Sequence, residues 1–255
     1  MNRPTPGQGR NRMIKCVTFD LDDTLWETAP VIRQANRELW HWLERNAPEF
    51  ARRHSLSDLA EGSAMRQQLL AQRPEIAHSM TLIRQALLKQ GCQSVGYGEA
   101  QAEALAQAAF EVFIRARHRV EPFAPVPAML AQLRTQGYLI GALSNGNADV
   151  SCTPLGALFD FQFNADTVGS AKPHPGMFER ALEHTGLQPE QLVHVGDHPI
   201  NDVQAARQLG IWTVWVSLPG QVWPEPARAD AVVRCLSAVP ETVEQIALRA
   251  RSGKG

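Results

Sequence analysis

The chain has 255 residues, 44% of them hydrophobic, which allows one large domain or two small ones with a sizeable core. The formal net charge is −1, so the overall charge gives no reason to expect nucleic acid or an anionic membrane as a partner. No stretch of apolar sequence is long enough to span a bilayer.

The N-terminal segment and the cysteines both indicate a cytoplasmic protein. Residues 1–12 are polar, contain prolines and glycines and lack an apolar core, which predicts a disordered leader rather than a signal peptide. The cysteines stand far apart without Cys-x-x-Cys spacing, at Cys16, Cys92, Cys152 and Cys235. Free thiols of this kind favour a reducing compartment, and we expect the cytoplasm.

The first predicted elements are one buried strand and then a series of helices. Residues 14–19 form an apolar run that predicts the strand, and residues 27–120 change to helical periodicity. One stripe ends at Gly91, which predicts a helix C-terminus there. The basic run 115–119 closes the last stripe and is interpreted as a solvated helix end.

After the proline-rich stretch 121–127, short apolar strands alternate with helices. Strands are predicted over 138–143, 192–195 and 212–216, with a helix over 200–209. This alternation predicts an α/β fold with a Rossmann-like parallel sheet, interrupted after its first strand by an all-helical insertion. After the leader, the chain is predicted to divide into two domains. The α/β core comprises residues 13–26 and 122–255, and the helical cap comprises residues 27–121.

Polar residues follow three of the predicted strands. Asp20 and Asp22 follow the first, Ser144 and Asn145 follow the second, and Asp197 follows the third. Because ligands of parallel sheets bind at the carboxyl ends of the strands, we expect these residues at one edge of the sheet.

These polar residues suit chemistry on a phosphate group. Carboxylates two residues apart at a strand end, Asp20 and Asp22, can supply a nucleophile and a proton-transfer group. Ser144 and Asn145 can bind an oxyanion, and Lys172 precedes a predicted helix, an arrangement that binds phosphate. A simple turn at Ser144-Asn145 and a surface position for Lys172 remain the alternatives.

Three acidic residues at one sheet edge predict a cation. Asp20, Asp197 and Asp202 would repel one another unless a metal neutralised them, and oxygen ligands favour Mg2+. Asp202 could instead cap the helix that follows it. His194 lies on the predicted strand and is interpreted as a packed histidine rather than a zinc ligand.

In chain order, four motifs resemble those of the haloacid dehalogenase-like hydrolase superfamily. The motifs are Asp20-Leu-Asp22-Asp-Thr24, Ser144-Asn145-Gly146, Lys172-Pro173 and Gly196-Asp197 with Asp202. The resemblance covers nearly the whole chain and includes the position of the helical cap.

That resemblance implies a Mg2+-dependent phosphomonoesterase acting through an aspartyl-phosphate. Asp20 would be the nucleophile and Asp22 the acid and base. Ser144 and Lys172 would bind phosphate, helped by Asn145, while Thr24 orients the loop. Asp20, Asp22 through its carbonyl, Asp197 and Asp202 would form the metal site. Because the dehalogenases of the superfamily lack the second aspartate, Asp22 argues against dehalogenation.

The substrate is expected to be a small phosphate ester. The segment 73–81 resembles the branch of bacterial flavin-mononucleotide (FMN) and riboflavin-precursor phosphatases, which implies a ribityl phosphate. By that analogy, the residues that contact the leaving group would be Trp26, Arg33, His78 and Arg84. The alternatives are a sugar-phosphate mutase and a non-catalytic phospho-ligand sensor on the same fold, and the oligomeric state is not predicted.

Overall fold

The described part of the computed structural model, residues 13–218 and 228–252, contains one sheet of six parallel strands, and the predicted leader lies outside it. The strand order is β3-β2-β1-β4-β5-β6. The strands are β1 (Cys16–Phe19), β2 (Leu139–Ser144), β3 (Phe161–Asn164), β4 (Leu192–Gly196), β5 (Trp212–Val216) and β6 (Ala231–Val233).

The order of the strands creates a switch point beside β1. The chain runs outward from β1 through β2 to β3 and then returns to β4 on the other side of β1. All four residues of β1 are buried, as expected for a central strand covered on both faces. The carboxyl ends of β1 and β4 therefore form the crevice in which parallel sheets bind ligands.

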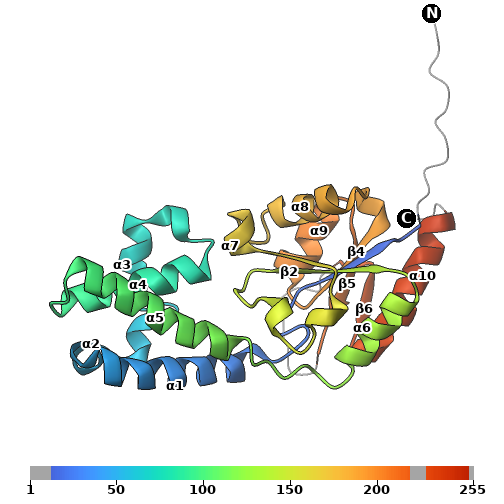
Figure 1. Cartoon of the computed structure of the whole chain (residues 1–255). Coiled ribbons are helices and arrows are strands. Elements are labelled where there is room, and N and C mark those ends of the chain that lie inside the picture. The colour runs from blue at the N-terminus through green and yellow to red at the C-terminus, as the bar shows by residue number, and fades with distance from the viewer. Residues whose placement is uncertain (1–12, 219–227, 253–255) are drawn as a thin grey trace, which may run out of the picture.

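Helices cover both faces of this sheet (Figure 1). On one face, α6 (Val126–Thr135) and α10 (Val239–Ser252) contribute buried residues such as Leu130 and Val243 to a shared apolar core. On the other face, α8 (Gly176–Thr185) and α9 (Ala205–Gln208) enclose a second core around Phe178. The short helix α7 (Ala165–Val168) follows β3.

The insertion between β1 and β2 is helical and stands beside the sheet as a separate lobe (Figure 1). It contains α1 (Thr28–Asn46), α2 (Pro48–Arg53), α3 (Ala64–Gln72), α4 (Met80–Ser94) and α5 (Glu99–Arg117). A buried cluster drawn from these helices, between Ala35 and Ala116, gives the lobe a core of its own. The predicted α/β fold with a helical insertion is confirmed.

One predicted helix end is wrong. The apolar stripe predicted a stop at Gly91, but α4 continues to Ser94 and Gly91 is buried inside it. An added Cβ at Gly91 would lie 2.3 Å from Cε2 of Phe50 in α2. Gly91 therefore permits close packing of two helices rather than ending one.

Two strands and one long helix were absent from the prediction. β3 and β6 are short edge strands. All residues of β3 are only partly buried, and in β6 Val233 alone is buried. The predicted helix over 200–209 begins as a π-helical turn, Pro199–Gln204, before α9. The C-terminal helix α10 was not predicted either.

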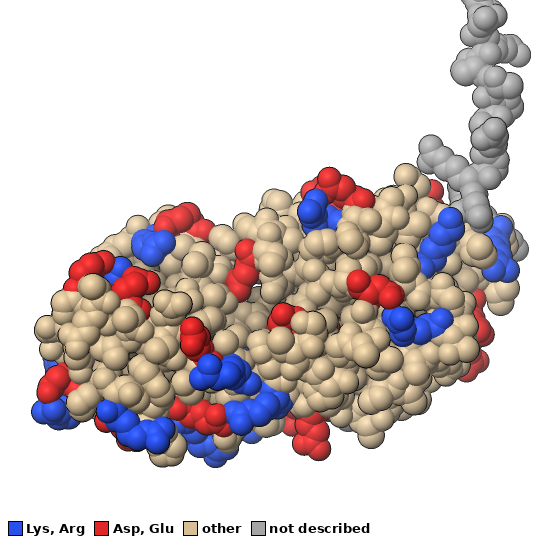
Figure 2. Space-filling model, in the orientation of Figure 1, with Lys and Arg blue, Asp and Glu red and all other residues tan. Residues whose placement is uncertain are grey.

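No helix within residues 13–218 and 228–252 combines the length and apolarity needed to cross a membrane. On the face shown in Figure 2, acidic and basic side chains are interspersed rather than gathered into one basic surface.

Candidate active site

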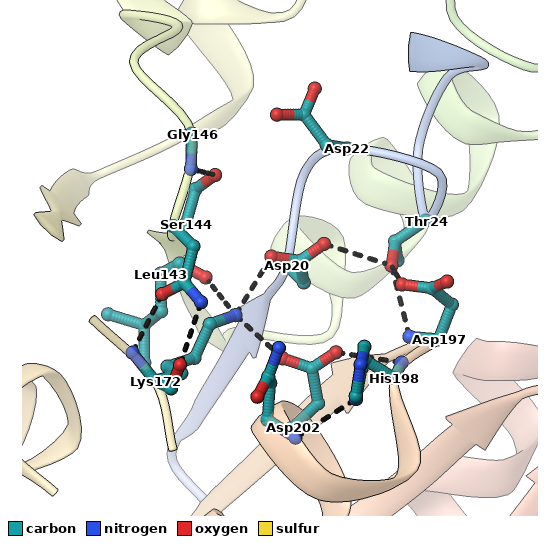
Figure 3. A network of polar contacts seen from close by, with 12 residues as sticks. Asp20, Asp22, Thr24, Leu143, Ser144, Gly146, Lys172, Asp197, His198 and Asp202 are labelled. Atoms are coloured by element: carbon teal, nitrogen blue, oxygen red, sulfur yellow. Dashed lines mark hydrogen bonds and ion pairs between the residues drawn. The ribbon is translucent and has the colours of Figure 1, made fainter. Parts of the chain in front are cut away.

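The predicted polar residues meet at the carboxyl ends of β1, β2 and β4 (Figure 3). They line a cleft of about 1120 Å³ between the sheet and the helical lobe. The catalytic, phosphate-binding and metal-ligand candidates in this lining are Asp20, Asp22, Ser144, Asn145, Lys172, Asp197 and Asp202.

A tight loop after β1 presents Asp20 and Asp22. Backbone hydrogen bonds from Leu25 to Leu21 and from Asp23 to Trp26 close it, and both leucines are fully buried anchors. Asp23 has a φ of 59°, which lies in the left-handed region that glycine adopts most readily and aspartate adopts occasionally.

The Lys172 ammonium is buried and makes three hydrogen bonds. It donates to Oδ1 of Asp20 at 2.8 Å, to Oδ1 of Asp202 at 2.6 Å and to the carbonyl of Leu143 at 2.6 Å. Burial by itself would lower the pKa of Lys172, but the two carboxylates outweigh it and raise the pKa above its usual range. Lys172 is thus a fixed positive charge beside Asp20.

Asp202 accepts a hydrogen bond from Lys172 and is itself held by neighbouring residues. Its carboxylate contacts Nε2 of His194 at 3.2 Å and accepts the backbone N–H of His198 at 3.0 Å. Burial opposes its charge, but Lys172 and His194 hold its pKa well below the usual range. Gly196 makes room, because an added Cβ there would lie 2.4 Å from Cγ of Asp202.

His194 is a packed histidine, as its strand position suggested. It lies on β4, is 1% exposed, and its Nδ1 is 2.9 Å from Oγ1 of Thr18. Burial lowers the pKa of His194, and the charge of Lys172 acts in the same direction, so both favour the neutral ring.

Carboxylate oxygens of Asp20, Asp197 and Asp202 lie within 4.8 Å of one another. Burial and the neighbouring Asp202 raise the pKa of Asp197 to about 6. Burial raises that of Asp20, and the charges of Asp202 and Asp197 add to this against the opposing effect of Lys172. An oxygen-only cluster in which Asp20 and Asp197 resist ionisation beside the charged Asp202 fits a hard divalent cation such as Mg2+, which would relieve the repulsion.

Thr24 and Asn145 both form hydrogen bonds with other residues of the site. Thr24 Oγ1 donates to Asp197 at 3.1 Å and contacts Asp20 at 3.3 Å, so it joins the two carboxylates. The Asn145 amide accepts from the backbone N–H of Lys172 at 2.7 Å and donates to its carbonyl at 2.8 Å. Asn145 therefore fixes the position of Lys172.

Ser144 is buried at the end of β2, and its Oγ accepts the N–H of Gly146 at 3.0 Å. An added Cβ at Gly146 would lie 2.2 Å from Oδ2 of Asp22. Gly146 is therefore needed for the close approach of the Asp22 side chain to this loop.

Asp22 points away from the Asp20 cluster (Figure 3). Its partners include Arg117 at the end of α5, whose Nη2 lies 2.5 and 2.6 Å from the two carboxylate oxygens. Trp26 Nε1, at 2.9 Å, and Thr28 Oγ1, at 3.1 Å, donate to Oδ1. The acid–base candidate is thus held by residues of the loop and of the cap.

Sequence reasoning missed Arg117, since the run 115–119 was interpreted as solvated. Arg115 and Arg119 are exposed, but Arg117 is 1% exposed. It lies four residues after the buried Phe113, so the apolar stripe of α5 continues through its position. This spacing is the signal that could have identified it.

The four residues proposed to contact the leaving group are in different settings. Trp26 is fully buried and contacts Asp22, and Arg84 lines a second cavity in the helical lobe. Arg33 is exposed, and His78 is partly buried. Neither Arg33 nor His78 lines the cleft or this second cavity, as far as the described residues define them.

Comparison with known proteins gives a consistent family. The sequence model for "haloacid dehalogenase-like hydrolase" matches residues 14–210. The 5-amino-6-(5-phospho-D-ribitylamino)uracil phosphatase YigB of Escherichia coli is 32% identical over 203 residues, covering 80% of this chain and 83% of that protein. A phosphoserine phosphatase of Thermus thermophilus is 28% identical over 224 residues, covering 80% of this chain and 88% of that protein.

Solved structures share the fold. A 2-haloacid dehalogenase from Pseudomonas syringae pv. Tomato DC3000 superposes with a TM-score of 0.84 and 36% identity, covering 91% of this chain and 99% of that one. A HAD phosphatase from Thermococcus onnurineus superposes with a TM-score of 0.62 at 21% identity, covering 90% and 98% of the two chains, a likeness of fold alone.

Proposed function

Because the chain belongs to the haloacid dehalogenase-like hydrolase family, we propose that it is a metal-dependent phosphomonoesterase acting through an aspartyl-phosphate on Asp20. The observation that carries this proposal is the pairing of Asp20, hydrogen-bonded to Lys172 at 2.8 Å, with a second aspartate, Asp22, at the mouth of the same cleft. A nucleophile, a fixed cation and a proton-transfer group are the parts that phosphoryl transfer requires.

In the proposed reaction, a carboxylate oxygen of Asp20 attacks phosphorus and the bond from phosphorus to the alcohol oxygen breaks. Asp22 gives a proton to the leaving alcohol, then takes one from the water that hydrolyses the aspartyl-phosphate. Lys172, together with Ser144 and the nearby backbone, stabilises the charge on the phosphoryl oxygens. Asn145 and Asp202 keep Lys172 in position.

Asp20, Asp197, Asp202 and the Asp22 carbonyl are the proposed holders of Mg2+. The cation would neutralise charge on the phosphoryl group. Because a relative with 32% identity is named for a ribityl phosphate, ribityl phosphates belong in the first panel of esters to test.

The test is phosphate release from a panel of phosphomonoesters, including FMN and ribityl and sugar phosphates, with Mg2+ or with EDTA. We expect metal-dependent release that falls by more than about 10³-fold in Asp20→Asn, because the amide is no nucleophile. Asp23→Asn changes the neighbouring carboxylate and is the matched control. Release that survives Asp20→Asn, or none from any ester, would refute the proposal.

A further inference from the structure

A second cavity of about 340 Å³, lined mostly by helices of the cap, lies beside the active-site cleft. Residues Asp22, Met80 and Gly146 line both this cavity and the larger cleft. We call it the cap cavity. The two cavities therefore adjoin at Asp22, the residue proposed to protonate the leaving alcohol.

Three arginines line the cap cavity, one from each of three helices: Arg66 of α3, Arg84 of α4 and Arg117 of α5. Asp22 neutralises Arg117. Across the described chain, neither Arg66 nor Arg84 forms an ion pair with a carboxylate. The other acidic residue in the lining is Glu61, which is exposed, so the cavity carries more positive than negative charge.

The Arg84 guanidinium is held by neutral partners. Its Nη1 donates to Oδ1 of Asn36 at 3.0 Å, and its Cζ lies 3.8 Å from the ring centroid of Phe113. Burial, and then the charge of Arg66, lower its pKa to about 10. A partly buried cation beside a like charge costs free energy that an anion would recover.

Arg117 adds an independent observation. Its Nη1 is buried and has no hydrogen-bond partner among residues 13–218 and 228–252. A buried donor left unpaired is costly, so this side of the cap holds positive charge that its own residues do not fully satisfy. The remaining lining is largely apolar, from residues such as Ile83 and Leu87.

We propose that the cap cavity binds a second anionic group, so that the substrate is a phosphomonoester whose alcohol part carries a carboxylate or another phosphate. This inference rests on the proposed phosphomonoesterase activity. An apolar lining with a few convergent cations would hold the carbon skeleton and orient the anion. Arg84 and Arg66 are the residues proposed to select it.

The test compares aldonate phosphates with the alditol phosphates of the same chain length, including the ribonate and ribitol pair. The two differ only in a carboxylate against a neutral CH2OH group. We expect kcat/KM to be about 10- to 100-fold higher for the aldonate phosphate of best-fitting length. Alditol bisphosphates form a second arm, and preference for these would identify a phosphate instead.

Arg84→Met and Arg66→Met should each reduce this preference about tenfold or more, and Arg84→Lys should retain part of it. Arg37→Met removes an exposed arginine of α1 and should preserve the preference. Equal kcat/KM for neutral and anionic partners in the unaltered enzyme would overturn the inference, as would an equal loss for both classes in Arg84→Met.

Calorimetric binding separates this inference from the proposed function. If no ester is hydrolysed, the proposed function fails, and the binding of aldonate against alditol phosphate decides the anion site alone. Tighter aldonate binding that Arg84→Met weakens about 10-fold or more supports the site. Binding that ignores the carboxylate refutes it.

Discussion

The two carboxylate oxygens of Asp22 are held by Arg117, and one of them also by Trp26 and Thr28. Asp22 lines both the cleft and the cap cavity, so it lies where the two adjoin. Arg117 is therefore a positioning residue in the proposed mechanism. It ties the geometry of the acid–base group to the last turn of a cap helix.

We predict that Arg117→Met lowers kcat about 10- to 100-fold for an alkyl phosphate, because Asp22 loses the contact that fixes both its oxygens. The loss should be much smaller for p-nitrophenyl phosphate, whose leaving group needs little protonation. Steady-state kinetics on both esters measure this difference. Arg115→Met, an exposed change two residues away, is the control. Equal losses with both esters would show that Arg117 serves structure alone.

At the scale of elements, the strand ends and the cap helices each position part of the candidate site. β1, β2 and β4 deliver Asp20, Ser144 and Asp197 to one edge, and the cap helices deliver Arg84 and Arg117 from the opposite side. The cap can do this only if its own helices keep their spacing. Gly91, against Phe50, sets that spacing between α4 and α2.

Gly91→Ala should destabilise the protein by about 1–3 kcal/mol, because its methyl group would overlap Phe50. Thermal unfolding measures the effect, and a fall in Tm of several degrees is expected. Gly98→Ala is the control, since an added Cβ there has no atom within 4 Å. An unchanged Tm in Gly91→Ala would contradict the packing role.

Hydrophobic patterning and motif order were enough to predict the sheet, the insertion and most of the residues at the sheet edge. The predicted strands β1, β2, β4 and β5 are apolar runs buried on the sheet, and such runs are visible in one sequence. The strands β3 and β6 were not predicted, because edge strands are only partly buried and so have a weaker apolar pattern. The spacing of Arg117 from Phe113 could have indicated that Arg117 is buried, but no local pattern encodes its pairing with Asp22, 95 positions away in the chain.

For the whole molecule, the cleft and the cap cavity lie where the two lobes meet. Contacts across this junction include Thr81 of α4, whose hydroxyl donates to Asp166 at 2.5 Å, and Asn147, which contacts Thr81 at 3.3 Å. The two lobes thus enclose the cavities in which we propose that phosphoryl transfer and leaving-group binding take place.

The acidic cluster links the stability of the molecule to pH and metal. The folded-state pKa of Asp197 is raised to about 6 from 3.8, and that of Asp20 is raised too. In the metal-free protein, the folded state therefore keeps protons that the unfolded state releases, and stability falls as pH rises from about 4 to about 6.

Mg2+ should accordingly raise Tm more at about pH 7.5 than at about pH 5, where protons compete for the same oxygens. At about 100 times Kd, the gain at the higher pH is about 2.7 kcal/mol. Thermal unfolding with matched ionic strength measures it, and Asp197→Asn should reduce the shift. An equal Mg2+ effect at both pH values would contradict the metal assignment.

The measurement that most directly tests the central claim is detection of phosphorylated Asp20 in a single turnover quenched with acid. We predict a hydroxylamine-sensitive phosphoryl group on the peptide that contains Asp20, forming and decaying fast enough to account for kcat. In Asp20→Asn, the modified peptide should be absent. Phosphate release with no phosphorylated peptide at any time, or phosphorylation at another residue, would contradict the proposal that Asp20 is the nucleophile.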